Sequence, residues 1–195
     1  MKNICVIAAH PDDEVLGVGG TIARLKQEGA KITVIVVTDG SSAQHKAGSE
    51  LHVRRKEHLR KANEILGTDE VIVLKLPDMR LDTLAHMDMN REIENVFSKR
   101  EFDTVFTHHP GDVNLDHQMV YKSTLVICRP HPGQSVKQLL TYQTLSSTEW
   151  GANTANNIFI PNRFFDISDT LEIKIEAMEA YEDELKTAPH PRSIE

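Results

Sequence analysis

The sequence has little of several features that would each point to a particular class of protein. Only 2 of its 195 residues are cysteines, and the spacing of Cys5 and Cys128 suggests neither a disulfide framework nor a thiolate metal cluster. No apolar stretch approaches the roughly 20 residues of a membrane-spanning helix. The N-terminal Met1-Lys2-Asn3 leads into no convincing signal-peptide core. We therefore expect a reduced, cytoplasmic protein that does not insert into a membrane.

Positive charge is also scarce. The chain has 22 Lys and Arg against 29 Asp and Glu, which gives a net charge of -7. Nucleic acids and anionic membrane surfaces need a basic patch, so this balance argues against either as the main partner. With 39% hydrophobic and 26% charged residues, the composition is that of an ordinary globular protein. Histidine is plentiful by contrast: there are 10, several of them beside aspartates.

Apolar runs alternate with helical patterns along the chain. The patterns predict strands at residues 4–8, 31–38, 71–76 and 103–107, and helices at 15–27, 49–66, 88–99 and 117–127. Weaker patterns predict strands at 139–145 and 164–167 and a helix at 170–186. This alternation predicts a single α/β domain over residues 1–195, a three-layer Rossmann-like fold with a mostly parallel sheet and helices on both faces.

The glycine-rich segment Gly17-Val18-Gly19-Gly20 partly matches a dinucleotide-binding fingerprint. However, the third glycine position is Ile22, and the glycines lie inside the first predicted helix rather than before it. We therefore interpret them as positions where this helix packs closely against a strand.

Polar residues follow each of the first four predicted strands. The clusters are His10-Pro11-Asp12-Asp13-Glu14, Thr38-Asp39, Pro77-Asp78, and a run that begins at His108-His109 and ends at Asp116-His117. Ligands of open parallel sheets bind at the carboxyl ends of the strands. We therefore expect all four clusters to meet at one edge of the sheet.

The cluster at residues 10–14 has two interpretations when taken alone. Its imidazole and one carboxylate could bind a metal ion while another carboxylate acts as a base, or the carboxylates could cap a helix N-terminus. The cluster at Asp116-His117 favours the metal, because it supplies a third ligand from a distant part of the chain. Two histidines and one carboxylate are typical of catalytic zinc, although Fe(II) uses a similar triad.

These paired motifs resemble those of the PIG-L/LmbE family of zinc-dependent N-deacetylases, which remove acetyl groups from N-acetylglucosamine-type amines. The resemblance extends to Arg54 and Glu57, Leu66-Gly67, Pro77-Asp78, residues 146–150 and residues 190–193. It implies that His10, Asp13 and His117 hold zinc. It also implies that Asp12 is the general base, and that the chain self-associates as a homo-oligomer.

The implied reaction is hydrolysis of the acetyl amide of a small-molecule amino sugar or N-acetylglucosamine-type conjugate. Zinc would lower the pKa of water to about 7 and polarise the acetyl carbonyl, while Asp12 takes the proton. Asp116 is expected to orient His117, with a helix cap as the alternative. Arg54 and Asp78 are candidates for substrate binding, with a solvated helix face and a simple turn as the respective alternatives.

One position departs from the family pattern. Many members carry a histidine three residues before the last metal ligand, where it is thought to help the oxyanion, and this chain has Asn114 there. An amide donates a hydrogen bond but cannot act as a cationic acid. We therefore consider His109 or His108 as the group that supplies this role. Trp150, in a polar loop, either stacks on the sugar or packs in the core or an interface.

Two other functions compete with a sugar deacetylase. One is a non-catalytic sugar- or nucleotide-binding domain that retains the fold, and the other is a deacylase of a different amide. The intact set of His10, Asp12, Asp13 and His117 favours an enzyme over a binding domain.

Overall fold

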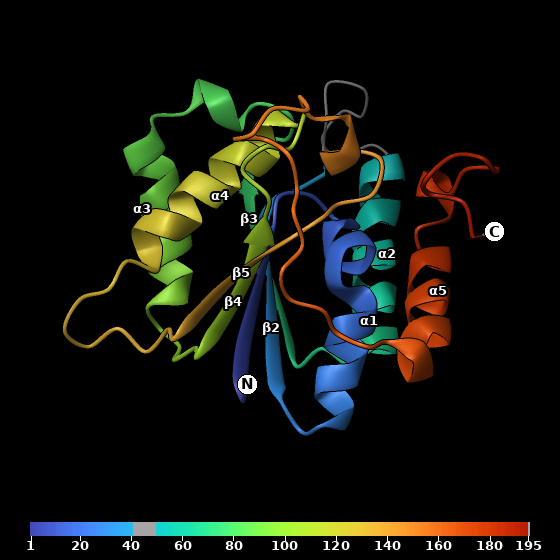
Figure 1. Ribbon diagram of the computed structural model, residues 1–195, viewed down its shortest axis with the longest axis horizontal. Coiled ribbons are helices and arrows are strands. Elements are labelled where there is room, and N and C mark those ends of the chain that lie inside the picture. The colour runs from blue at the N-terminus through green and yellow to red at the C-terminus, as the bar shows by residue number, and fades with distance from the viewer. Residues whose placement is uncertain (41–49, 195) are drawn as a thin grey trace.

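Five strands form one all-parallel sheet with helices on both faces (Figure 1). The computed structural model describes residues 1–40 and 50–194. The strands are β1 (Asn3–Ala8), β2 (Lys31–Thr38), β3 (Glu70–Leu76), β4 (Thr104–His108) and β5 (Gln138–Tyr142). Their order across the sheet is β3-β2-β1-β4-β5, so β1 lies at the centre with Cys5 paired to Thr33 and to Val105. The predicted α/β fold is confirmed.

The helices divide between the two faces of the sheet. They are α1 (Asp13–Gln27), α2 (Glu50–Leu66) and α5 (Leu171–Glu179) on one face, and α3 (His86–Phe97) and α4 (Leu115–Ile127) on the other (Figure 1). Side chains alternate along a strand, so Val6 joins the hydrophobic core under α1 while Ile7 joins the core under α3 and α4. Burial on both faces explains the continuous apolar runs in the sequence. Among the described residues, no helix combines the length and the apolar character needed to cross a membrane.

Two elements near the C-terminus differ from the sequence prediction. Residues 164–167 form no strand; this segment lies across α1, where Ile167 packs near Gly20 and the Asp166 carbonyl accepts a hydrogen bond from Arg24. The last helix ends at Glu179 instead of residue 186. Tyr181 then turns into the core, where only 1% of it is exposed, and this turn redirects the following segment toward the carboxyl edge of the sheet. Residue 49, predicted to begin the second helix, lies outside the described residues.

Close approach between α1 and β5 explains one of the glycines. A Cβ atom at Gly17 would overlap the ring of Tyr142. That ring cannot easily move, because it is 4% exposed and its hydroxyl donates to the carbonyl of Ile7 at 3.1 Å. The interpretation of the glycine-rich segment as a packing feature is therefore confirmed at this position.

We predict that Gly17→Ala lowers the free energy of unfolding by about 1–3 kcal/mol, because overpacking outweighs the gain in helix propensity. Urea denaturation would measure the change. Gly19→Ala is the matched control, since its Cβ would meet only side-chain atoms, at 3.3 Å or more. An alanine at position 17 that is tolerated as well as one at position 19 would contradict the packing argument.

Candidate active site

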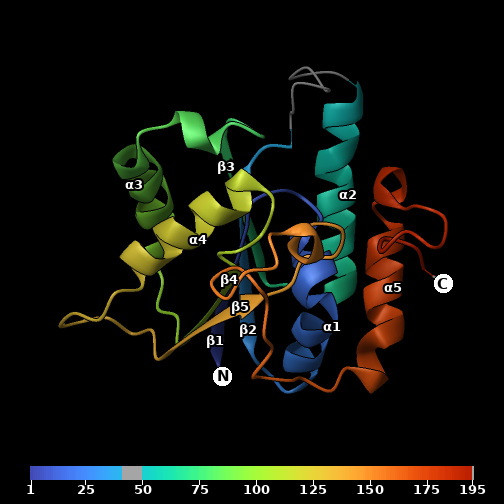
Figure 2. The ribbon, with the colours of Figure 1, turned by 45° about the horizontal axis from the view of Figure 1, so that its top comes forward.

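The segments that follow β1 and β4 lie over the carboxyl ends of the strands, together with the loop that follows β5 (Figure 2). The first segment bends sharply at Asp12, whose φ of 113° is in the left-handed region. A non-glycine residue there costs about 1–3 kcal/mol unless its surroundings hold it. The carboxylate of Glu14 does so by accepting a hydrogen bond from the Asp12 backbone at 3.1 Å. The bend brings Asp13 back toward His10, and the backbone N–H of His10 donates to Asp13 Oδ2 at 2.8 Å.

Three donor atoms from distant parts of the chain form a nearly equilateral triangle. His10 Nδ1 lies 3.2 Å from Asp13 Oδ2, and His117 Nε2 lies 3.3 Å from each of these two atoms. A tetrahedral ion with ligand distances of about 2.0–2.1 Å places neighbouring donors about 3.3–3.4 Å apart. The spacing of these side chains therefore fits a single metal ion.

The outer nitrogens of both imidazoles are bound to carboxylates. His10 Nε2 lies 3.1 Å from Asp116 Oδ2, and His117 Nδ1 lies 3.1 Å from Asp112 Oδ2. Carboxylates accept, so in the neutral imidazoles the outer nitrogens carry the protons and the inner ones present lone pairs. This arrangement fixes both rings in the tautomer that a metal ion requires.

The surroundings of the triangle are strongly negative. Five carboxylates gather there, each at most 5% exposed: Asp12, Asp13, Asp78, Asp112 and Asp116. Burial disfavours a charged imidazole at His117, but Asp13 and Asp112 outweigh it and raise its pKa to about 9. Buried charges need compensation, so this cluster favours a cation at its centre.

Asp12 lies beside the triangle and is not one of its donors. Burial and the neighbouring Asp13 together raise the pKa of Asp12 to about 7, against the opposing effect of Arg192 and Arg55. The residue lines a cavity of about 900 Å³ together with His10, Asp13 and His117. A carboxyl group that titrates near neutral pH is suited to transferring protons.

Comparison with known proteins identifies the family of this chain. Residues 5–128 match the PIG-L family, described as GlcNAc-PI de-N-acetylase. The chain belongs to the PIG-L family. The uncharacterized deacetylase YaiS of Escherichia coli is 36% identical over 154 residues, which are 75% of this chain and 76% of that protein.

Two further relatives are sugar deacetylases by name. The diacetylchitobiose deacetylase of Thermococcus kodakarensis is 27% identical, over 93% of this chain and 70% of that protein. The structure of N,N'-diacetylchitobiose deacetylase from Pyrococcus horikoshii superposes with a TM-score of 0.76 and 21% identity, covering 95% of this chain and 71% of that one. This last likeness establishes the shared fold.

Two residues of the second PIG-L motif have contacts other than those expected. Asp116 binds His10 rather than His117, and its other oxygen accepts from the Leu81 backbone at 3.0 Å. The carboxylate that orients His117 is Asp112, four residues earlier than expected. The N-cap of α4 is Asn114, whose Oδ1 accepts from the Asp116 backbone at 2.9 Å. The expected pairing of Asp116 with His117 is therefore wrong.

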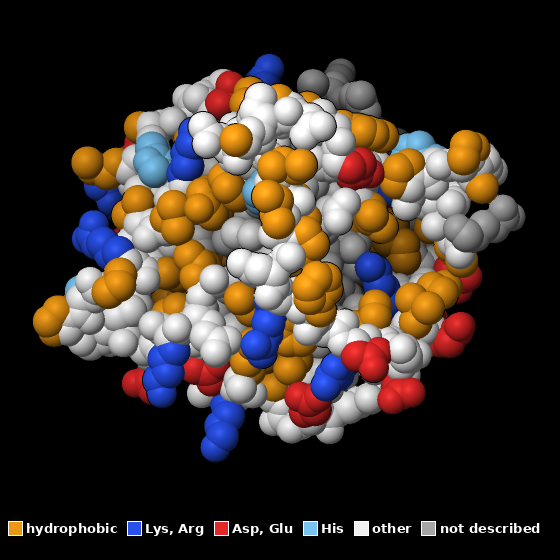
Figure 3. Space-filling model, viewed as in Figure 1, with side chains coloured by type: hydrophobic (Ala, Val, Ile, Leu, Met, Phe, Trp, Pro, Cys, Tyr) orange, Lys and Arg blue, Asp and Glu red, His pale blue; other side chains and the backbone are white. Residues whose placement is uncertain are grey.

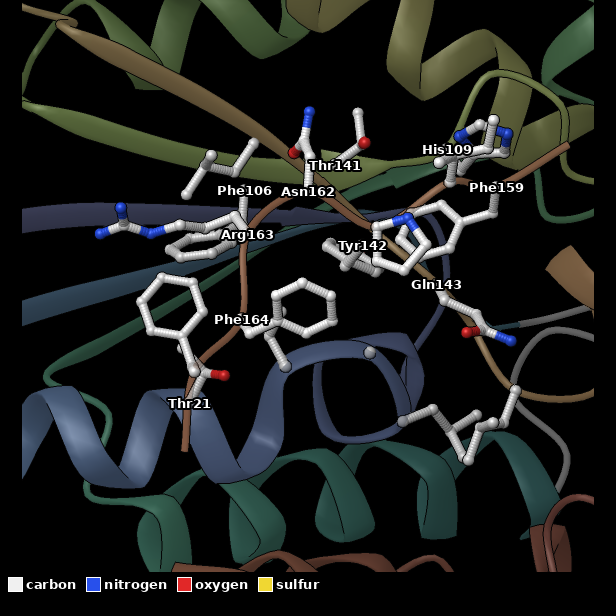
Figure 4. Close-up of a pocket in the computed structure, with 18 of the residues that line it drawn as sticks. Thr21, Phe106, His109, Thr141, Tyr142, Gln143, Phe159, Asn162, Arg163 and Phe164 are labelled. Atoms are coloured by element: carbon white, nitrogen blue, oxygen red, sulfur yellow. The ribbon is translucent and has the colours of Figure 1, made fainter. Parts of the chain in front are cut away.

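Neither histidine considered as a substitute at Asn114 is placed for that role. His109 lies in a separate groove of about 600 Å³, where its Nε2 donates to the Asn157 carbonyl and its ring meets the edge of Phe159 (Figure 4). His108 is fully buried and stacks on His117. Burial lowers the pKa of His108 to about 4, and its Nε2 accepts from the Ala9 backbone, so it is neutral.

The groove that holds His109 is open to the surface, and most of the side chains that line it are hydrophobic. Hydrophobic side chains gather across the middle of the face shown in Figure 3, where residues 158–167 cross between β5 and α1. Ile158, Ile160 and Phe164 are the exposed hydrophobic residues of this segment. The groove contains none of the three donor atoms of the triangle.

Of the two candidates for substrate binding, Asp78 is among the described residues that line the cavity and Arg54 is not. Arg54 is exposed on α2, and the cavity is lined instead by its neighbour Arg55. The sequence contains a signal that favours Arg55 over Arg54, since Arg55 shares a helix face with the buried Leu59 and Ala62. Asp78 does line the cavity, but it accepts from Thr38 Oγ1 and lies 3.5 Å from His10 Nε2, so it supports the histidine.

We predict that Asp112→Asn weakens metal binding about 10- to 100-fold, because the amide no longer fixes the proton on His117 Nδ1. Titration of zinc against a chelator of known affinity would measure the loss. Asp88→Asn, at an aspartate whose side chain is 65% exposed on α3, is the control that should bind zinc normally. Equal zinc affinity of the two variants would show that Asp112 does not orient His117 for metal binding.

Proposed function

We propose that this chain hydrolyses the N-acetyl group of an amino sugar or an N-acetylglucosamine-type conjugate. The proposed metal, zinc with Fe(II) as the alternative, is held by His10, Asp13 and His117. The observation that carries the proposal is the triangle of donor atoms beside Asp12, with both imidazoles locked by carboxylates. The sugar deacetylases among its relatives support the choice of substrate.

The side chains around the triangle have different roles in the proposed reaction. When bound, a zinc ion lowers the pKa of water to about 7 and polarises a carbonyl oxygen. Asp12 accepts the proton as water attacks the acetyl carbon, and it then delivers a proton to the nitrogen as the C–N bond breaks. The products are acetate and the free amine. Asp112 and Asp116 hold the two imidazoles in place throughout.

Asn114 is the proposed neutral hydrogen-bond donor to the acetyl oxygen. Its Oδ1 is engaged by the Asp116 backbone, which fixes the orientation of the amide. Its Nδ2 is consequently directed toward Met79 Sδ, 3.8 Å away in the cavity wall. A preorganised donor of this kind stabilises negative charge that develops on a carbonyl oxygen.

The cavity has the size and lining that a sugar substrate requires. Its volume of about 900 Å³ is within the range of small-molecule sites. Trp150 lies in its wall with 56% of the residue exposed, so its ring is accessible to a sugar face. Arg55 and Lys186 also line the cavity and supply polar groups for the sugar hydroxyls.

We predict that the protein releases free amine from at least one member of a panel of N-acetylated sugars. Asp12→Asn should lower kcat about 10²- to 10⁴-fold, because the amide cannot accept the proton. The variant should retain its metal, which elemental analysis would measure. His117→Ala should lose both the metal and the activity.

The same measurements separate this proposal from the other candidate functions. Zinc-loaded protein that is inert toward every N-acetylated sugar but cleaves another amide would make it a different deacylase. Sugar binding without turnover would make it a binding domain. An Asp12→Asn variant with the wild-type rate would remove Asp12 from its proposed role.

A further inference from the structure

Arg192 reaches the candidate base from the far end of the sequence. Its Nη1 lies 3.2 Å from Asp12 Oδ2, although 180 residues separate the two. The side chains of Arg192 and Asp12 are 19% and 6% exposed, so solvent screens this ion pair only partly. Neither the metal triangle nor its supporting carboxylates explain why a guanidinium lies here.

The guanidinium is fixed by two further acceptors. Its Nη1 donates to Glu184 Oε2 at 2.7 Å, and its Nε donates to Ser146 Oγ at 2.5 Å. Glu184 is itself held by Arg55, which binds its other carboxylate oxygen. Arg192 is therefore anchored from two separate parts of the chain before it contacts Asp12.

Asp12 needs such a partner because its own support is confined to the backbone. Glu14 holds the Asp12 N–H, which fixes the peptide but leaves rotation about the Cα–Cβ bond free. A general base must lie within hydrogen-bond reach of the proton that it takes. A misplacement of about 1 Å can cost roughly 100-fold in rate.

We propose that Arg192 is a positioning residue for Asp12, an inference that rests on the deacetylase function proposed above. By holding Oδ2, it fixes the carboxylate so that Oδ1 takes the proton from water. The Glu184–Arg55 pair keeps the guanidinium in the plane that this contact requires. Lysine cannot replace it, because an ammonium lacks the planar fork that binds Ser146, Glu184 and Asp12 together.

The test compares Arg192→Ala and Arg192→Lys with the wild type, each in the whole 195-residue chain. Both should lower kcat, by about 100-fold for alanine, with KM within about threefold and with zinc content unchanged. Guanidinium chloride at about 50 mM, well below denaturing concentrations, should restore part of the kcat of Arg192→Ala by filling the vacated space. Arg91→Ala, at a surface arginine paired with Asp88, is the control and should show neither loss nor rescue.

A crystal structure of the zinc-loaded Arg192→Ala protein supplies a readout that does not depend on activity. The Asp12 carboxylate should adopt a different rotamer, while His10, Asp13 and His117 keep their positions. An unmoved carboxylate, or a loss of kcat without guanidinium rescue and with loss of zinc, would overturn the positioning role. A wild-type protein inert on the whole sugar panel would instead overturn the proposed function, and the rotamer of Asp12 would still decide whether Arg192 positions it.

Discussion

Two imidazole nitrogens that face each other across 3.3 Å impose the constraint on which the rest of the site depends. When both imidazoles are neutral, Asp116 and Asp112 hold the protons on the outer nitrogens, and the lone pairs of the inner nitrogens point at each other and at a carboxylate oxygen. Like partial charges at this distance repel unless a cation lies between them. A proton or a metal ion between these atoms relieves the repulsion, and the spacing of the three donor atoms fits a single metal ion.

The sheet brings the two halves of this site together. The motif at residues 10–14 and the run at residues 108–117 are about a hundred residues apart, but β1 and β4 are neighbours and pair in parallel from Ile4 and Thr104. Both strands end at the same edge, so the residues that follow them meet. This chain holds the arrangement without a disulfide between Cys5 and Cys128, because two hydrophobic cores hold the strands from either side.

The sequence was sufficient for the fold and for the meeting of His10, Asp13 and His117 at one edge of the sheet. It failed where the direction of a side chain decided the outcome. Apolar runs and paired motifs are local patterns, so they can be recognised in the sequence alone. Neighbouring residues at a strand end point to opposite sides, which puts His108 against His117 and His109 in the other groove. Arg54 and Arg55 are likewise neighbours that lie on different faces of α2, so only Arg55 lines the cavity. Contacts of the C-terminal segment have no periodic signal, and the resemblance at residues 190–193 does not indicate which side chains they contact.

The supports of the candidate base and of the metal ligands come from different parts of the molecule. Asp112 and Asp116 belong to the loop and helix that follow β4. Asp12 is instead held through Glu14, which binds Asn63 of α2 and Tyr181 beyond α5, and through Arg192. A change in α2, α5 or the C-terminal segment can therefore displace the base while the metal ligands stay in place. This division explains why the motifs at residues 10–14 and 116–117 can be recognised in the sequence, whereas the contact of Arg192 with Asp12 is visible only in the structure.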